Sequence, residues 1–146
     1  MKIFIGSDHA GYELKKALKR FLATGKNEVE DCGAFSYNET DDYPDFIKPV
    51  AEKTIENPGS YGIILGGSGE GEAIVANRTR GVRAVVYYGG PIDIVKISRE
   101  HNDANVLSLG ARFLEPKEAI RAVDVWLQTK FSEDERHLRR IKKIDL

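Results

Sequence analysis

A glycine-rich loop, Gly66-Gly67-Ser68-Gly69-Glu70-Gly71-Glu72, holds the residues of this chain whose types and spacing best suit chemistry. It follows the apolar run Tyr61 to Leu65 and leads into a helical pattern, which predicts a strand-to-helix turn. Successive backbone N–H groups at such a turn point into one concavity, and the helix dipole adds roughly half a positive charge there. The loop therefore predicts an anion site.

The residue that ends this loop indicates which anion it suits. Gly66 and Gly71 have the spacing of a Walker phosphate loop, but Glu72 stands where that loop has its lysine. The dinucleotide fingerprint also fails, because Gly67, Gly69 and Gly71 run as G-x-G-x-G. A carbon acid beside a carbonyl loses its proton readily when a base receives it and donors stabilise the oxyanion. Loop amides and Glu72 supply both parts, so we expect proton abstraction; the alternative is a connector with two solvated glutamates.

Length, charge and cysteine content exclude several classes of protein. The chain has 146 residues, 22 basic against 23 acidic side chains and a net charge of −1. We expect one domain over residues 1–146 and no binding of nucleic acid or membrane. Cys32 is the only cysteine, which excludes an intrachain disulfide and favours a reducing compartment. No signal-peptide pattern and no apolar run of about 18 residues occurs, so we expect a cytoplasmic protein.

Short aliphatic runs alternate with amphipathic segments, which predicts an α/β fold with a parallel sheet and helices on both faces. The expected strands are Lys2–Ile5, Glu28–Asp31, Tyr61–Leu65, Val82–Tyr87 and Val106–Leu109. The expected helices are Gly11–Leu22, Tyr43–Ile55, Gly71–Asn77, Ile92–Asn102, Pro116–Thr129 and a terminal helix, Ser132–Ile144. Ligands of such sheets bind at the carboxyl ends of the strands.

Other polar side chains flank the expected strands. Asp8 and His9 follow the first strand, Arg112 follows the fifth, and His101 and Asn102 end the helix before the fifth. A metal is the alternative use of the histidines, but no zinc spacing such as H-E-x-x-H occurs, so we expect none. The serine of the glycine-rich loop lacks the G-x-S-x-G context of a nucleophile, and we expect it to donate a hydrogen bond to the substrate.

The expected terminal helix carries a candidate phosphate clamp. Arg136 and Arg140 are four residues apart and share a face, with His137 beside them. Two guanidinium groups on one face suit a phosphate, and Arg112 would add a third cation if the helix returns to the site. The alternative is a solvated basic face.

Five motifs in this order resemble one family. They are Gly6-Ser7-Asp8-His9-Ala10-Gly11, Asp42-Tyr43-Pro44, the loop Gly66 to Glu72 followed by Ala76-Asn77-Arg78, Arg99-Glu100-His101-Asn102, and Arg136-His137-Leu138-Arg139-Arg140. Together they resemble ribose-5-phosphate isomerase type B, of the RpiB/LacA/LacB sugar-phosphate isomerases. The resemblance spans nearly the whole chain.

The resemblance implies a three-layer α/β/α sandwich with a Rossmann-like, five-stranded parallel sheet and a C-terminal helix. It implies a homodimer, or a dimer of dimers, whose sites draw on both subunits. The implied reaction interconverts ribose 5-phosphate and ribulose 5-phosphate through an enediolate without a cofactor. Many members use a cysteine as base at the position of Gly66. This chain is similar to the other branch, in which Glu72 takes the proton.

The resemblance also implies residue roles. Glu72 would move the proton between C2 and C1, and His101 would act as the acid that opens the furanose ring. The implied substrate-binding residues are Asp8, His9, Tyr43, Gly67, Ser68, Gly69, Glu70, Gly71, Asn102, Arg112, Arg136, His137 and Arg140. Among these, Arg112, Arg136, Arg140 and His137 would grip the phosphate.

Glu70 departs from the family pattern, in which this loop position is neutral. A second carboxylate beside an enediolate costs anion stabilisation unless it points outward or binds a substrate hydroxyl. Three functions therefore stay open. These are the pentose phosphate isomerase, an isomerase of allose or galactose 6-phosphate, and a noncatalytic phosphosugar- or nucleotide-binding module.

Overall fold

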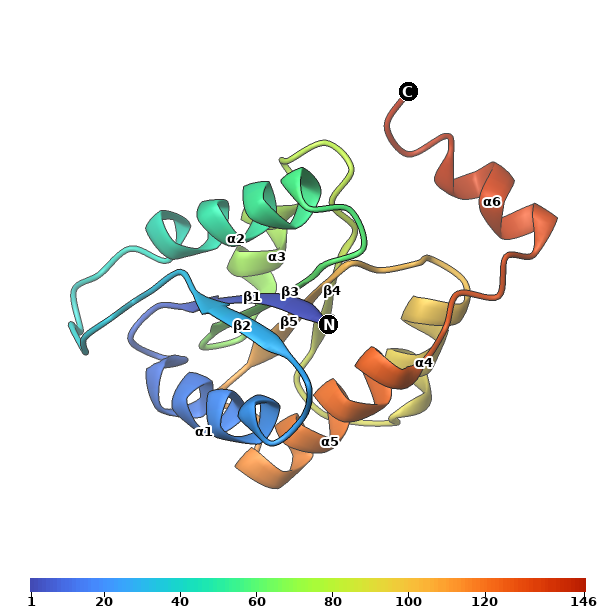
Figure 1. Ribbon diagram of the computed structural model, residues 1–146. Helices are drawn as coiled ribbons and strands as arrows, with labels where there is room; N and C mark the ends of the chain where they lie inside the picture. Colours follow the sequence, from blue (N-terminus) through green and yellow to red (C-terminus); the bar gives the residue numbers. More distant parts are fainter.

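Five parallel strands form the centre of the computed structural model, which describes all 146 residues (Figure 1). They are β1 (Lys2–Ser7), β2 (Glu28–Asp31), β3 (Tyr61–Gly66), β4 (Ala84–Tyr87) and β5 (Val106–Gly110). Their order across the sheet is β2-β1-β3-β5-β4. After β2 the chain crosses to the other side of β1, so β1 and β3 flank the switch point at which open α/β sheets bind ligands.

Six helices cover the sheet or extend from it. They are α1 (Tyr12–Ala23), α2 (Pro44–Glu56), α3 (Glu70–Ala76), α4 (Asp93–Glu100), α5 (Pro116–Gln128) and α6 (Glu135–Ile141). Helices α1, α4 and α5 lie on one face, and α2 and α3 lie on the other (Figure 1). The predicted three-layer sandwich with a C-terminal helix is therefore confirmed.

Both faces of the central strands are buried. Ile3 and Ile5 of β1 pack with Trp126 on the side of α1 and α5, whereas Phe4 packs with Val50 on the side of α2. Each of these side chains is at most 1% exposed. A strand that is buried on both faces has a continuous apolar sequence, which is why these strands could be predicted.

The predicted boundaries lie within two residues of the observed ones, except at the terminal helix. The fourth strand begins at Ala84 instead of Val82, because Val82 closes a turn by donating to the carbonyl of Thr79. The terminal helix begins at Glu135 instead of Ser132, since the intervening chain passes through a left-handed backbone conformation.

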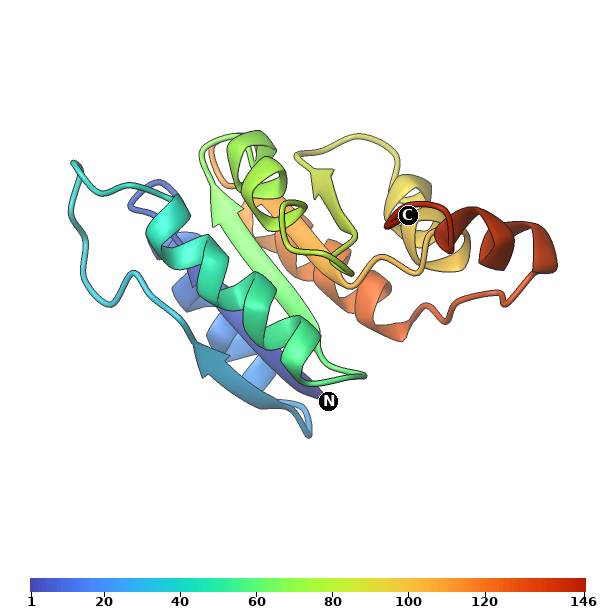
Figure 2. The same ribbon diagram turned by 90° about the horizontal axis from the view of Figure 1, so that it is seen from above.

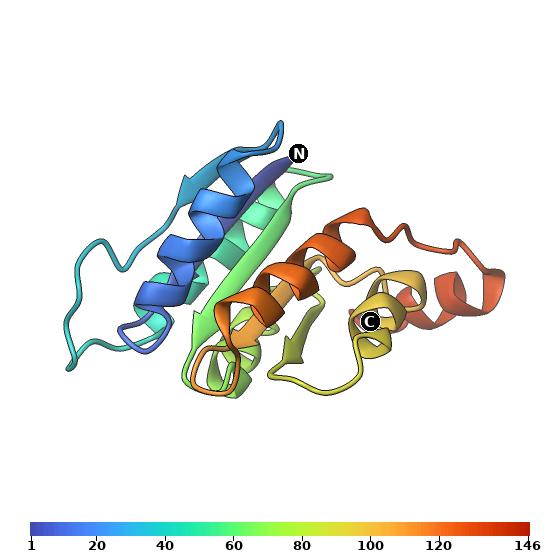
Figure 3. The same ribbon diagram turned by 90° about the horizontal axis from the view of Figure 1, so that it is seen from below.

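Helix α6 lies apart from the sheet, on the side of α4 (Figure 2 and Figure 3). The backbone N–H of Ser132 donates to the carbonyl of Glu100, at 3.1 Å, and fixes the approach to α6. Beyond α6, the carboxylate of Asp145 accepts a hydrogen bond from the N–H of Gly81, also at 3.1 Å. The helix is thus anchored on both sides. None of the helices combines the length and apolar character that crossing a membrane requires.

Candidate active site

The loop between β3 and α3 is shaped by Gly69. This residue has φ 81°, in the left-handed region that favours glycine, and it directly precedes α3. Its carbonyl accepts a hydrogen bond from the hydroxyl of Ser108 on β5, at 2.6 Å, and the hydroxyl of Ser68 accepts one from the N–H of Glu70, at 3.2 Å. The first bond holds the loop against the carboxyl end of β5, and the second lies within the turn that begins α3.

Glu72 follows this loop and is buried in the first turn of α3. It is 4% exposed, and its carboxylate lies so close to Gly66 that a Cβ on that glycine would overlap it. Burial raises the pKa of Glu72 above its usual value, and the charge of Asp8 raises it further, whereas hydrogen bonds from the N–H groups of Glu72 and Gly69 oppose the shift. A carboxyl group with a raised pKa is a better base near neutral pH than a solvated one. Glu70, in contrast, is exposed.

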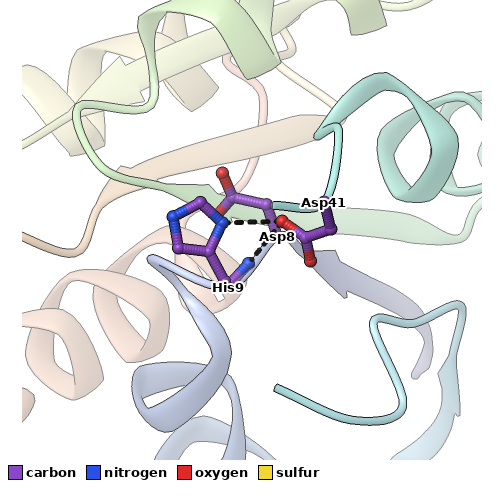
Figure 4. A group of neighbouring side chains, drawn as sticks. All are labelled: Asp8, His9 and Asp41. Carbon is purple, nitrogen blue, oxygen red and sulfur yellow. Dashed lines mark hydrogen bonds and ion pairs between the residues drawn. The ribbon is translucent and has the colours of Figure 1, made fainter. Parts of the chain in front are cut away.

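The turn after β1 brings Asp8 and His9 to the same edge of the sheet. Asp8 is 7% exposed and accepts a hydrogen bond from the N–H of Gly11, at 3.2 Å. A Cβ on Gly11 would lie 2.6 Å from Cβ of Leu65, so the turn packs directly against the end of β3. His9 lies beside Asp8 and bonds to Asp41 (Figure 4).

Tyr43 and Arg112 border the glycine-rich loop. A Cβ on Gly71 would lie 2.9 Å from the Tyr43 hydroxyl, and a Cβ on Gly67 would lie 3.1 Å from Nη1 of Arg112. The N–H of Arg112 also donates to the carbonyl of Gly67, at 3.0 Å. One cluster, here called the carboxyl-edge group, therefore contains Asp8, His9, Tyr43, Gly67, Ser68, Gly69, Glu70, Gly71, Glu72 and Arg112.

The remaining predicted residues form a second cluster, here called the amino-edge group, which contains His101, Asn102, Arg136, His137 and Arg140. His101 follows α4, and the chain then enters β5 at Val106, which pairs with Gly62. The glycine-rich loop begins where Gly66 pairs with Gly110. Four residues of strand, about 13 Å at roughly 3.3 Å per residue, separate these two edges. The two groups do not converge on one site within one chain.

A ring stack joins α6 to α4 in the amino-edge group. The rings of His101 and His137 lie 4.3 Å apart between centroids and 17° from parallel. Burial lowers the pKa of His137, and the neighbouring His101 and Arg136 lower it further. Arg136 and Arg140 remain exposed, and Arg136 contacts Asp134 at 3.5 Å. Within one chain α6 therefore does not return to Arg112, because it packs at the opposite end of the strands.

Two arginines fix the chain next to His101. Asp103, which has φ 46°, accepts hydrogen bonds from Arg99, at 2.8 Å, and from Arg83, at 3.0 Å. Arg83 also donates from Nε to the carbonyl of Asn102, at 3.0 Å. Sequence reasoning did not single out Asp103 or Arg83, because the two lie 20 residues apart and form no motif.

Asp8, His9 and Asp41 are the group of side chains with donors suited to a cation. Their ligand atoms lie within 4.8 Å of one another. However, Nδ1 of His9 and an oxygen of Asp41 bond to each other, which occupies one donor of each. The absence of a metal stays a prediction.

Comparison with known proteins relates this chain to one family. The family model described as Ribose/Galactose Isomerase matches residues 3–144. The chain belongs to this family. Ribose-5-phosphate isomerase B of Mycobacterium leprae is 43% identical over 141 residues, which are 97% of this chain and 86% of that protein. A probable ribose-5-phosphate isomerase B of Mycoplasma pneumoniae is 39% identical and covers 97% of this chain and 91% of its own length.

Solved structures of the family share the fold. Ribose-5-phosphate isomerase B of Mycoplasma genitalium, with bound ribulose-5-phosphate, superimposes with a TM-score of 0.92 at 39% identity, over 98% of this chain and 93% of that one. The enzyme of Thermotoga maritima gives a TM-score of 0.91 at 43% identity, over 99% and 97%. The resemblance predicted from the five motifs is confirmed.

Proposed function

We propose that this protein interconverts ribose 5-phosphate and ribulose 5-phosphate, as its membership in the ribose/galactose isomerase family supports. The observation that carries the proposal is Glu72, a buried carboxyl group enclosed by a loop of backbone amides at the switch point of the sheet. Residues 1–146 act as one isomerase domain, without a cofactor. The single, half-buried thiol of Cys32 fits a cytoplasmic location.

The reaction moves one proton between adjacent carbons. Glu72 removes the proton from C2 of the open-chain aldose, and the electron pair forms the enediolate between C1 and C2. Amides of Gly67 to Gly71, with the Ser68 hydroxyl, donate hydrogen bonds to the enediolate oxygens. Glu72 then returns the proton to C1, while the hydroxyl proton passes from O2 to O1. His101 is the acid that opens the furanose ring beforehand.

The separation of the two groups supports a homodimer with composite sites. Within one chain, Glu72 and His101 lie at opposite edges of the sheet. A two-fold axis would bring the amino-edge group of one subunit to the carboxyl-edge group of its partner, twice over. Exposed apolar side chains on α3 and α4, Ile74, Ile94 and Ile97, supply a surface for that contact. A dimer of dimers would repeat this unit.

In each composite site, one subunit would supply the base and Arg112, and the other would supply His101 and the remaining phosphate-binding residues. Arg136 and Arg140, with His137, would bind the phosphate together with Arg112 of the partner. Asp8, His9 and Asn102 would hold sugar hydroxyls or the phosphate, and Tyr43 would line the pocket. The exposed position of Glu70 supports a location of its charge outside the enediolate site.

Purified protein assayed with ribose 5-phosphate tests the activity directly. Paired assays with allose 6-phosphate and galactose 6-phosphate separate the pentose from the hexose alternative. Glu72→Gln should abolish exchange of the C2 proton with solvent while phosphosugar binding persists. Glu70→Gln, in the same loop but exposed, is the matched control and should exchange normally. Persistent exchange in Glu72→Gln would exclude Glu72 as the base, and binding without turnover by the unaltered protein would favour the noncatalytic module.

A further inference from the structure

Asp41 is a buried carboxylate in the loop between β2 and α2. Its side chain is 6% exposed, although no helix or strand contains it. It reaches across to the turn after β1 and contacts His9, 32 residues earlier in the chain (Figure 4). Aspartate is rarely buried without a partner, so this contact accounts for its position.

One oxygen of Asp41 holds His9 at two points. Oδ1 accepts a hydrogen bond from the backbone N–H of His9, at 3.1 Å, and lies 2.6 Å from Nδ1 of the ring. A carboxylate has no proton to donate, so the ring donates from Nδ1. The backbone bond fixes the start of the side chain and the ring bond fixes its rotation.

The bond at Nδ1 determines what His9 presents at Nε2. Nε2 makes no hydrogen bond within the chain, and the side chain is 22% exposed. With the proton held on Nδ1, Nε2 is an acceptor in the neutral ring and a donor in the imidazolium form. Tyr37 packs edge-on against the same ring, with centroids 6.1 Å apart, and further limits its movement.

The second oxygen of Asp41 indicates that the residue serves more than loop anchoring. Oδ2 is buried and has no hydrogen-bond partner. An unpartnered carboxylate oxygen destabilises the fold, and an amide or hydroxyl would anchor the loop without a buried charge. The charge that a carboxylate adds is useful where its partner bears a positive charge, as an imidazolium does.

We propose that Asp41 is a positioning residue, which holds His9 so that Nε2 faces an oxygen atom of the bound sugar phosphate. The proposal rests on the proposed function, in which His9 contacts the substrate. In this proposal Asp41 does not contact the substrate, because its side chain is buried and bonded to His9. Its effect must therefore pass through His9.

A double-mutant cycle tests this dependence. Asp41→Asn keeps the shape of the side chain and an acceptor for the backbone N–H, but removes the charge. It should raise KM for ribose 5-phosphate about tenfold with a smaller change in kcat, and have little effect when His9 is already alanine. Equal losses in both backgrounds would overturn the proposal. Glu39→Gln, an exposed carboxylate of the same loop, is the matched control.

Two further measurements do not depend on turnover. The 15N resonances of the His9 ring should report a proton on Nδ1 in the unaltered protein and lose that preference in Asp41→Asn. A ring protonated only on Nε2 would contradict the proposal even if isomerase activity is absent. Inhibition by inorganic phosphate and by ribose distinguishes a contact of Nε2 with a phosphate oxygen from a contact with a sugar oxygen. The inhibitor that binds more weakly to Asp41→Asn than to the unaltered protein identifies which oxygen Nε2 contacts. If neither inhibitor binds more weakly, the proposal is overturned.

Discussion

The carboxylate of Glu72 occupies the space in which a side chain at position 66 would lie, so Gly66 and Glu72 are spatially dependent on each other. The resemblance implies that many members of this family carry a catalytic cysteine at position 66. A cysteine there and a glutamate in the observed position would require the same volume. The two ways of supplying a base at this loop therefore exclude each other in this geometry.

Gly66→Ala should inactivate the protein without unfolding it. The added methyl group displaces only the flexible end of Glu72, so the fold adjusts while the base moves away from C2. We expect kcat/KM to fall by about 100-fold or more, the usual contribution of a positioned base. Steady-state kinetics and a thermal melt measure the two effects separately.

Gly62→Ala is the matched control for this substitution. Its Cβ would lie 2.9 Å from the hydroxyl of Thr54 and 3.0 Å from a methyl group of Val106, far from the loop. We expect the free energy of unfolding to fall by about 1–3 kcal/mol through overpacking, with activity largely kept. If Gly66→Ala instead retained full activity, the position of Glu72 would not matter for catalysis.

The pH dependence of catalysis should follow the raised pKa of Glu72. The base acts only when it is ionised, so kcat/KM should fall as the pH decreases through that pKa, which lies above the ordinary 4.5. Asp8→Asn removes a charge that raises this pKa, so it should shift the acid limb of the profile to lower pH. Glu70→Gln should leave the limb in place. A shift of the Asp8→Asn limb to higher pH would contradict this assignment.

The stability of the fold should also depend on pH through Glu72, in the direction opposite to that of the activity. Because the folded state raises the pKa of Glu72, it binds this proton more tightly than the unfolded chain does. The resulting contribution to stability is fully present below pH 4.5 and is lost as the pH rises through the raised pKa. Glu72→Gln should therefore gain in Tm over the unaltered protein as the pH rises. A constant difference across this range would show that Glu72 does not titrate in the fold.

Complementation between two inactive variants tests the composite site. Coexpressed Glu72→Gln and His101→Asn subunits should form mixed dimers, each with one intact site and one doubly altered site. Random pairing restores about a quarter of the unaltered activity, because half of the dimers are mixed and have one site of two. Each variant purified alone provides the baseline. Coexpressed protein no more active than either parent would place both residues in one subunit's site.

Alkylation of thiols should leave the activity intact. Cys32 is the only cysteine, and burial raises the pKa of its thiol to about 11. The thiolate is the reactive form, so iodoacetamide should react slowly at neutral pH. Mass spectrometry and residual activity, followed over the same time course, provide the measurement. Rapid loss of activity at low labelling would count against Glu72 as the base.

The sequence predicted the parts of this fold that depend on local pattern. The apolar runs around Ile5 and Ile63 identify strands because both faces of the sheet are covered. The glycine-rich loop indicated Glu72 as a candidate base, because the loop and this acid are contiguous in the sequence. The roles assigned to Glu72, His101 and the binding residues remain predictions.

Features that depend on distant contacts could not be predicted in this way. Asp41 lies 32 residues from His9, and no spacing rule relates an unstructured loop to a turn. The start of α6 depends on a left-handed residue, Glu133, rather than on helix propensity. The placement of His101 at the amino edge followed only from the pairing of β5 with β3.

The stack of His101 on His137 holds α6 at a fixed distance from the end of α4. In the proposed dimer, the ring-opening acid His101 and two of the phosphate-binding arginines, Arg136 and Arg140, belong to one subunit, in which the rings of His101 and His137 stack 4.3 Å apart. The distance between the acid and the phosphate site is then set by the protein and not by the sugar. A substrate with one more carbon between its ring oxygen and its phosphate could make only one of two contacts, that of the ring oxygen with His101 or that of the phosphate with the arginines. Selection by the separation of ring oxygen and phosphate would then follow from a contact between two protein side chains.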